Sequence, residues 1–290
     1  MSKLAACVVL YYPDENTFGN ILSYAYDVDS IIIVDNTEES NQDLINPLKE
    51  LLLDKLIYIN NGSNLGIATA LNIACKKAKE MHFEWILTMD QDSSFDNFKY
   101  YKECFIKVKD IPKLALLAAN TNEEKGNSFM TYQYLEDKIT VITSANILNL
   151  SYYTELGGFE DKLFIDMVDY DYCFKVKINK LKILYFNDVF VNHKIGEIYL
   201  RKHFLTGKVK YKAGHNFQRV YYIARNSLYI AKKYGNEFPK EISLQKVIKN
   251  LYIKDIKRTI AYDPDKLKRI KAKLLALYHF LVNKYGRYDI

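Results

Sequence analysis

The sequence predicts an α/β fold with a central, mostly parallel sheet flanked by helices, and a helical C-terminal extension. Short apolar runs alternate with stretches in which apolar residues recur at three- and four-residue spacing. The runs are apolar at consecutive positions, which is typical of parallel strands covered on both faces. At 290 residues the chain can form one large α/β domain with an appendage.

The first half of the chain supplies the predicted sheet strand by strand. Buried strands are expected at Leu4–Leu10, Ser30–Val34, Leu56–Ile59 and Trp85–Met89. Helices are expected between them at Asn16–Tyr26, Asn41–Leu53 and Gly66–Met81. Ligands collect beyond the carboxyl ends of the strands in such sheets. The polar residues that follow these strands therefore form one candidate site: Asp35, Asn36, Asn64, Asp90 and Asp92.

The second half mixes strands with longer helices. Strands are expected within Leu114–Leu150, around a polar loop at Asn120–Ser128, and again at Lys182–Asn192. Helical patterns cover Leu163–Asn179, Arg219–Tyr234 and Leu267–Tyr285. We predict two parts, a sheet-bearing domain over residues 1–225 and a basic helical extension over residues 226–290.

The net charge of +6 is concentrated in the tail. From Lys246 to the end there are 12 Lys or Arg and 4 Asp or Glu, a local excess of +8, so the remainder carries about −2. A nucleic-acid binder normally carries its basic stripe across the working face, so we expect no nucleic-acid partner. The chain has no apolar run of the roughly 18 to 20 residues that span a membrane. The cysteines form no CxxC pair, which indicates buried free thiols in a reducing cytoplasm: Cys7, Cys75, Cys104 and Cys173.

The first pattern with chemical content is Asp90-Gln91-Asp92, directly after a predicted strand. Where the chain turns at a strand end, the two carboxylates can converge on a hard cation such as Mn²⁺ or Mg²⁺. A cation held in this way keeps positions open for diphosphate oxygens and neutralises charge on a departing nucleotide. The alternative interpretation is a solvated turn.

Two further strand ends supply polar groups for a nucleotide. Asp35 can accept a hydrogen bond from a base or a ribose and Asn36 can fix the turn, whereas the alternative is a helix N-cap. Asn64, Gly66 and Asn72 lie in a small-residue entry to a helix, whose N-terminal N–H groups attract anions. The alternative at this helix is tight packing against the sheet.

Three carboxylates occur within six residues, at Asp166, Asp169 and Asp171. On a helix Asp166 and Asp169 would share a face, at positions i and i+3, while Asp171 would point elsewhere. A carboxylate at a helix start near a substrate hydroxyl is a suitable general base. Acids in a first helical turn also complement the helix dipole, which is the alternative interpretation.

His193 ends a predicted strand and is a candidate metal ligand or diphosphate donor, although a lone histidine is also a common structural residue. Arg219, Arg225 and Asn226 fall on a predicted helix. The two arginines do not share a face of that helix, so we expect at most one of them to reach the site. Arg225 is our candidate.

Taken together, seven segments resemble the family 2 glycosyltransferases, which have the GT-A fold, and within them the bacterial rhamnosyltransferase-like group. They run from Val8 to Asn226, about three-quarters of the chain, and their order and spacing make the resemblance specific. The segments are Val8–Asp14, Ile33–Thr37, Asn64–Asn72, Leu87–Ser93, Gly157–Phe174, Val191–Gly196 and Tyr221–Asn226.

This resemblance implies roles for single residues. Asp90 and Asp92 would form the DxD motif that holds the metal and the donor diphosphate, and His193 would approach the metal. The family's usual Glu-Asp pair is Val168-Asp169 in this chain, so Asp169 is the expected catalytic base and Asp171 the next choice. Asp35 would contact the uracil or thymine base of the donor. The complete candidate donor-binding set is Asp35, Asn36, Asn64, Gly66, Asn72, Asp90, Gln91, Asp92 and Arg225.

The implied activity is an inverting, metal-dependent transfer of a sugar to a cell-surface polysaccharide, without a covalent enzyme intermediate. The group favours L-rhamnose from dTDP-rhamnose, and a galactofuranosyl or other hexosyl residue from a UDP-sugar is the alternative. From other classes, a non-catalytic nucleotide- or glycan-binding module stays open. A nucleotidyltransferase would need a Gly-rich basic loop near the N-terminus, which Tyr11-Tyr12-Pro13-Asp14 does not provide.

The basic and aromatic tail is typical of a helix at a membrane interface, which suits a glycan or lipid-linked glycan acceptor. We therefore expect a cytoplasmic protein with peripheral contact at the inner face of the cell membrane. The alternatives are packing of the tail on the catalytic domain and a homodimer.

Overall fold

The computed structural model describes residues 3–120, 134–135, 138–193, 198–202, 206–207, 209–213, 215–263 and 265–288. The chain divides into two compact units, which we describe separately. The first unit comprises Met1–Glu160 and Asp169–Lys194, and the second comprises Asp161–Val168 and Ile195–Ile290. Beyond Asn120, the polar loop expected at Asn120–Ser128 lies outside the described residues.

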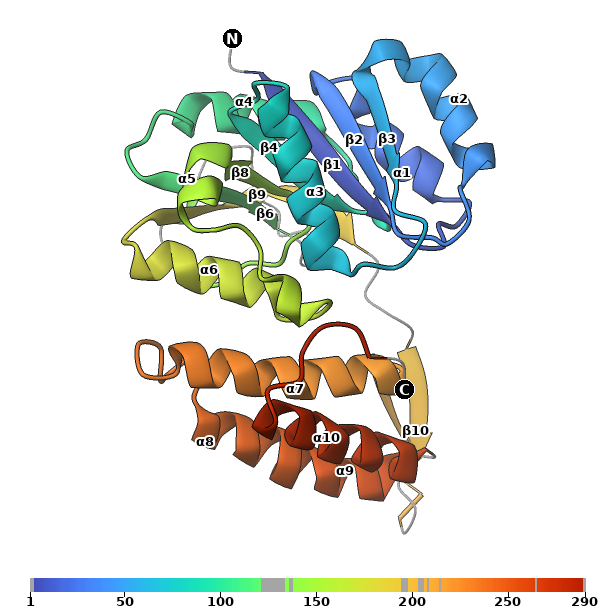
Figure 1. Cartoon of the computed structure of the whole chain (residues 1–290), viewed down its shortest axis with the longest axis vertical. Coiled ribbons are helices and arrows are strands. Elements are labelled where there is room, and N and C mark those ends of the chain that lie inside the picture. Colours follow the sequence, from blue (N-terminus) through green and yellow to red (C-terminus); the bar gives the residue numbers. More distant parts are fainter. Residues whose placement is uncertain are drawn as a thin grey trace. The chain divides into compact units, whose positions relative to one another are not determined.

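The first unit is built on the predicted sheet, and the amino-terminal part of this sheet is parallel (Figure 1). Its strands lie in the order β3-β2-β1-β4. The register pairs Leu10 with Asp35 and Val9 with Asp90, so the carboxyl ends of these strands meet at one edge. The strands are β1 (Leu4–Leu10), β2 (Ser30–Asp35), β3 (Leu56–Asn60) and β4 (Trp85–Asp90).

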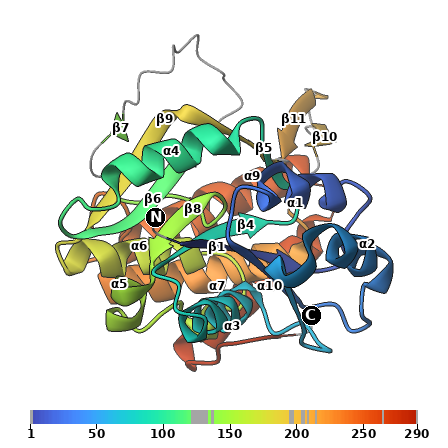
Figure 2. The same cartoon turned by 90° about the horizontal axis from the view of Figure 1, so that it is seen from above.

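Helices cover both faces of this sheet, which is why its strands are apolar at consecutive positions. Alternate residues of β1, namely Leu4, Ala6 and Val8, join one core with side chains of α1, α2 and α4. Helix α3 packs on β1 and β2 from the opposite face (Figure 2). The helices are α1 (Thr17–Ala25), α2 (Gln42–Leu52), α3 (Ile67–Glu80) and α4 (Phe98–Val108), and a 3₁₀ turn η1 (Leu53–Lys55) leads into β3.

The rest of the sheet is mixed in direction. Strand β8 (Asn146–Asn149) runs antiparallel between β4 and β6 (Leu114–Asn120), and β9 (Lys182–His193) lies parallel to β6. The short strands β5 (Ser93–Phe95) and β7 (Tyr134–Leu135) pair antiparallel with β9. Helix α5 (Leu150–Glu155) follows β8, and α6 (Val168–Ile178) precedes β9. The predicted α/β class is confirmed.

The helix predicted over Leu163–Asn179 is wrong in its first turn. A 3₁₀ turn η2 (Asp161–Leu163) comes first, and α6 begins only at Val168. Between them Asp166 and Met167 have φ angles of 64° and 65°. These left-handed conformations cannot continue a right-handed helix, so the chain changes direction before Asp169.

The second unit is mainly helical. Helices α7 (Phe217–Tyr234) and α10 (Lys266–Leu281) pack side by side (Figure 1), with Tyr221, Ala224, Ala272 and Ala276 in one core cluster. The other elements are a hairpin of β10 (Ile198–Lys202) and β11 (Val209–Ala213), α8 (Leu244–Val247), a π-helical segment η3 (Ile248–Lys254) and α9 (Asp255–Tyr262).

Helix α7 is a single continuous helix, and the boundary expected between Arg225 and Asn226 falls inside it. Among the described helices of both units, none combines the length and the apolar character needed to cross a bilayer.

Candidate active site at the carboxyl ends of the strands

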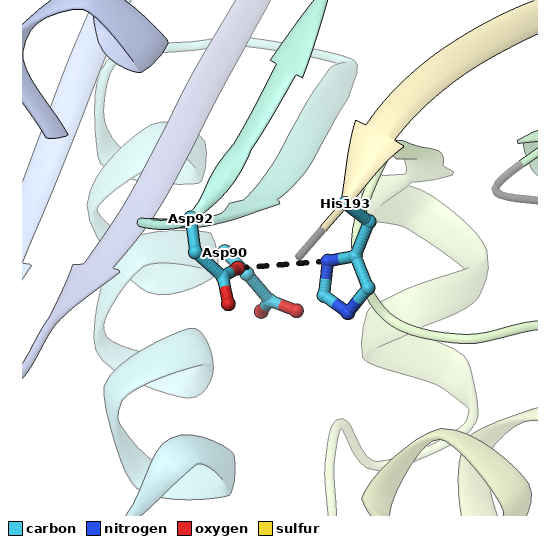
Figure 3. Close-up of side chains that lie close together, drawn as sticks. All are labelled: Asp90, Asp92 and His193. Atoms are coloured by element: carbon cyan, nitrogen blue, oxygen red, sulfur yellow. Dashed lines mark ion pairs between the residues drawn. The ribbon is translucent and has the colours of Figure 1, made fainter. Parts of the chain in front are cut away.

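The turn after β4 carries Asp90-Gln91-Asp92, and the middle residue fixes this turn. Gln91 Oε1 accepts a hydrogen bond from Tyr11 N at 2.7 Å, and Gln91 Nε2 donates to Tyr11 O at 3.2 Å. Asn20 Nδ2 donates to Gln91 O at 2.9 Å. Gln91 is thus bound to the loop that follows β1, while Asp90 and Asp92 point towards His193 (Figure 3).

Strand pairing brings His193 to this turn from far along the sequence. The register of β5 and β9 places Ser93 opposite His193. His193 Nδ1 lies 2.7 Å from Ser93 Oγ and 3.5 Å from Asp92 Oδ1. One ligand atom from each of Asp90, Asp92 and His193 lies within 4.8 Å of the other two (Figure 3). The structure therefore brings together all three metal ligands predicted from the sequence.

Two serine hydroxyl groups, those of Ser144 and Ser93, form hydrogen bonds to residues of the cluster. Asp90 N donates to Ser144 Oγ at 3.2 Å, and Ser144 Oγ donates to Ser93 Oγ at 2.9 Å. Ser93 Oγ can also accept from Nδ1–H of His193, and its own hydrogen then points at Asp92 Oδ1, 3.5 Å away.

The donor set fits a divalent cation. Two carboxylates and one imidazole match the ligand preferences of Mn²⁺, and the carboxylates suit Mg²⁺ as well. Around a cation at about 2.1 Å, neighbouring ligands lie about 3 Å apart and opposite ligands about 4.2 Å apart. The three ligand atoms lie within 4.8 Å of one another, a separation comparable to these distances.

Asp35 ends β2 and is completely buried. Its Oδ1 accepts from Thr37 N at 2.9 Å, and its Oδ2 accepts from Asn41 Nδ2 and from Tyr58 OH, each at 2.7 Å. Burial and the bond to Asp35 raise the pKa of Tyr58, so the phenol is the donor in this pair. Asp35 therefore does not cap α2, whose N-cap residue is Asn41. Asp35 instead holds the loop that follows β2, through its hydrogen bonds to Thr37 and Asn41.

Asn36 links neighbouring strand-end loops. Its Nδ2 donates to Gly66 O at 3.2 Å, and its Oδ1 accepts from Asn61 Nδ2 at 2.8 Å. The loops after β1 and β2 also border a polar hollow of about 280 Å³, lined by Pro13, Asp14 and residues 40–44. This open hollow includes Asn41, which donates to Asp35, and its polar lining is suitable for a base or a ribose.

The entry to α3 has two separate functions in the fold. Asn64 Oδ1 accepts from Gly66 N at 2.9 Å, and Gly66, with a φ of 85°, stands at the helix N-cap. Asn72 forms two hydrogen bonds with the main chain of Phe159. Its Nδ2 donates to the carbonyl and its Oδ1 accepts from the amide, both at 2.9 Å. A Cβ on Gly158 would come within 2.8 Å of Tyr153 Oη, so this turn needs a glycine there. Asn72 thus holds the turn that follows α5.

Asp169 and Asp171 differ in exposure although both lie in the first turn of α6. Asp171 is fully buried, and its Oδ2 lies 3.0 Å from Lys175 Nζ. Lys175 in turn donates to Gly158 O at 2.8 Å. Asp169 is only partly buried and borders a small cavity of about 10 Å³ with Asn146 and other residues. Of the two candidate bases, Asp169 is therefore the accessible one.

Asp166 does not share a helical face with Asp169, which corrects the expectation from the sequence. It precedes α6 in a left-handed conformation and belongs to the second unit, where Arg219 Nη2 lies 2.6 Å from its Oδ1. The i, i+3 argument fails because it assumed that the helix started before Asp166.

Arg225 is also part of the second unit, and its guanidinium is completely buried. It donates to Gly286 O at 2.8 Å, to Leu163 O at 3.3 Å and to Asn226 Oδ1 at 3.0 Å. Three aromatic rings surround it, those of Tyr221, Tyr222 and Tyr285. The structure thus places Arg225 among backbone carbonyls and rings of its own unit, not in the strand-end cluster of the first unit.

The comparison with protein-family models identifies the domain that carries the turn after β4. The model of glycosyl transferase family 2 matches residues 15–157. The match includes β2, β3, β4 and the Asp90-Gln91-Asp92 turn. This chain therefore carries a glycosyl transferase family 2 domain. The matched segment ends before Asp169 and His193, so these two residues rest on the geometry alone.

A relative of this glycosyltransferase aligns over nearly the whole chain. The dTDP-rhamnosyl transferase RfbF of Shigella flexneri is 25% identical over 310 residues, covering 99% of each chain. Similar solved structures include S. aureus TarS 1-349 in complex with UDP-GlcNAc, at a TM-score of 0.53 and 15% identity, covering 99% of this chain and 94% of that one. GalNAc-T7 with UDP, GalNAc and Mn²⁺ gives a TM-score of 0.55 at 12% identity, covering 66% of this chain and 43% of that one. These structures share the fold.

Two residues of the glycosyltransferase's cluster were not singled out from the sequence. Ser93 follows Asp92 directly, and this adjacency was the only available signal. Ser144 has no local signal, since it reaches Asp90 only because β8 runs antiparallel beside β4.

The cysteines provide no nucleophile. All four are buried free thiols, as predicted, and burial raises the pKa of Cys7 and of Cys173 to about 12. These thiols therefore stay protonated at neutral pH.

Proposed function

We propose that this glycosyltransferase is an inverting, metal-dependent enzyme that transfers L-rhamnose from dTDP-rhamnose to a cell-surface polysaccharide. One observation carries the metal-dependent part: Asp90, Asp92 and His193 converge at the edge where the parallel strands end. Similarity to a dTDP-rhamnosyl transferase along 99% of the chain supports the choice of donor. A UDP-hexose or UDP-galactofuranose donor is the alternative.

The donor half of the site would be formed by the first unit. Asp90, Asp92 and His193 would hold Mn²⁺ or Mg²⁺, which supplies charge neutralisation for the leaving diphosphate when bound. The free N–H groups at the start of α3, after Asn64 and Gly66, would favour the anionic donor. The hollow lined by Asp14, Ser40 and Asn41 would receive the base. Because Asp35 is already bound by three donors, we expect it to act mainly by shaping this hollow.

The acceptor half would depend on Asp169. As general base it would take the proton of an acceptor hydroxyl, whose oxygen then attacks the anomeric carbon from the face opposite the nucleotide. This single displacement inverts the configuration. Asp171 would support the start of the helix through Lys175 rather than take the proton, since its carboxylate is fully buried and paired.

We further propose a glycan or lipid-linked glycan as the acceptor. The enzyme would work in the cytoplasm, with its basic C-terminal helices in peripheral contact with the inner face of the cell membrane.

A panel of donors tests this proposal. We expect dTDP-rhamnose to raise the melting temperature with Mn²⁺ more than UDP-galactofuranose, UDP-glucose or UDP-galactose do, because the base and sugar contacts add to those of the diphosphate. Thermal shift with Mn²⁺ and with EDTA is the measurement. A larger shift with a UDP-sugar would replace the rhamnosyl donor, and no shift with any nucleotide sugar would contradict the proposal.

A further inference from the structure

Helix α10 carries large apolar side chains on its outer side. Leu267, Leu274 and Leu281 are 79%, 55% and 66% exposed, and Tyr278 is 59% exposed. These four residues follow one another at intervals of seven, four and three, so they form one row along the helix. At 1.5 Å per residue the row is about 21 Å long. We call it the α10 row.

The inner side of the same helix contains alanines, with Leu275 packed against the same core and Lys273 and His279 also buried. Ala272 and Ala276 are buried in the core cluster that contains Tyr221 and Ala224 of α7. A helix that serves only to cover its own unit turns its large apolar residues inward and its polar residues outward. In α10 the leucines of the row point the other way, so packing within the unit does not explain them.

The charge on α10 itself has one sign, and one exposed acid, Asp265, stands at its N-cap. Helix α10 contains five basic residues and no acidic one. Of the five, Lys273 lies 2.6 Å from Asp255 and Arg269 lies 3.6 Å from Asp263, so both pair with acids of the same unit. The other three are exposed on or beside the row: Lys266, Lys268 and Lys271.

We infer that the α10 row docks on the surface of an anionic lipid bilayer, with the helix lying in the plane of the interface. Leucines would enter the boundary between headgroups and acyl chains, the tyrosine would sit at headgroup level, and the lysines would reach the lipid phosphates. This inference names the surface and the type of lipid for the peripheral membrane contact in the proposed function. It rests on the proposed function only for the identity of the acceptor.

The lysines favour lipid over a second copy of the chain. A symmetric dimer formed through the α10 row would enclose Lys271, which lies between Leu267 and Leu274 on the same face of the helix, in the interface. Lysine is also depleted from the cores of protein interfaces. Phosphate groups of an anionic bilayer neutralise these charges instead.

Vesicle co-sedimentation of the full chain tests the inference. We expect binding to vesicles of phosphatidylglycerol and phosphatidylcholine, weak binding to phosphatidylcholine alone, and loss of binding as salt is raised. The double variant Leu274→Glu/Leu281→Glu removes two apolar contacts and adds two negative charges, so its partition coefficient should fall at least about tenfold. Lys268→Gln/Lys271→Gln should weaken binding to the anionic vesicles only.

The matched control is Ile106→Glu/Ile178→Glu, which changes two exposed isoleucines of the first unit in the same way. It should bind vesicles like the unchanged protein, and circular dichroism should show that both double variants are folded. Equal loss in both variants, or no binding to anionic vesicles, would overturn the inference. So would a dimer in sedimentation velocity that Leu274→Glu/Leu281→Glu converts to a monomer without any vesicle binding. Donor-induced thermal shift in the same samples separates this failure from failure of the proposed function.

Discussion

At the scale of single residues, the three carboxylates before and within α6 have three different environments. Asp166 pairs with Arg219 in the second unit, Asp171 is buried beside Lys175, and Asp169 alone combines partial exposure with a position at the start of the helix. Their spacing in the sequence did not separate them, and only the resemblance to the family favoured Asp169. Their separation depends on the left-handed residues before Val168, which no local spacing rule indicates.

The variant Asp169→Asn tests the role of this residue. It keeps the size of the side chain and removes the proton acceptor, so the rate of sugar transfer should fall by about 10²- to 10⁴-fold. The thermal shift caused by donor and Mn²⁺ should persist, because the metal ligands are unchanged. Asp161→Asn, at an exposed position ahead of the helix, serves as the control. Transfer at an undiminished rate would remove Asp169 from the mechanism.

At the scale of elements, α7 forms hydrogen bonds to the segment of residues 163–166, which precedes Asp169. Asn226 is fully buried, and its Nδ2 lies within hydrogen-bond distance of three carbonyls, those of Leu163 at 2.8 Å, Ile165 at 2.8 Å and Asp166 at 3.0 Å. Arg225 adds bonds to Lys162 O and Leu163 O. The Tyr-Tyr-Ile-Ala-Arg-Asn motif therefore organises an irregular segment of its own unit.

Removal of the Asn226 amide should loosen this segment. Asn226→Ala leaves buried carbonyls without a donor, so the free energy of unfolding should fall by about 2 to 3 kcal/mol. Trypsin should then cut after the exposed Lys162 faster than in the unchanged protein. Asn250→Ala, at an exposed position of the same unit, should leave both quantities unchanged. If Asn226→Ala resists trypsin as well as the original chain does, the segment is held by other contacts.

The elements also show where sequence patterns fail. The strands β1 to β4 were predictable because each is a continuous apolar run that needs burial on both faces. The pattern over Leu163–Asn179 mimicked a single helix, since Phe164 and Ile165 are apolar for a different reason. They pack against the core cluster of the second unit.

At the scale of the whole molecule, the candidate active site lies where the carboxyl ends of β1, β2 and β4 come together at one edge of the sheet. This much was predictable, because parallel strands bring their carboxyl ends to one edge. The contacts that support His193 were not predictable. They need antiparallel pairing of β5 with β9, which brings together Ser93 and His193 across 100 residues, and a hydroxyl from Ser144. Such long-range pairings leave no periodic trace in the sequence.

The central claim is that Asp90, Asp92 and His193 bind the cation that carries the donor diphosphate. Titration calorimetry of dTDP into the protein, with Mn²⁺ and with EDTA, tests it most directly. We predict that Mn²⁺ tightens binding at least about tenfold, or 1.4 kcal/mol, and that Asp92→Asn abolishes this difference. Equal affinities with Mn²⁺ and with EDTA in the unchanged protein would contradict the claim.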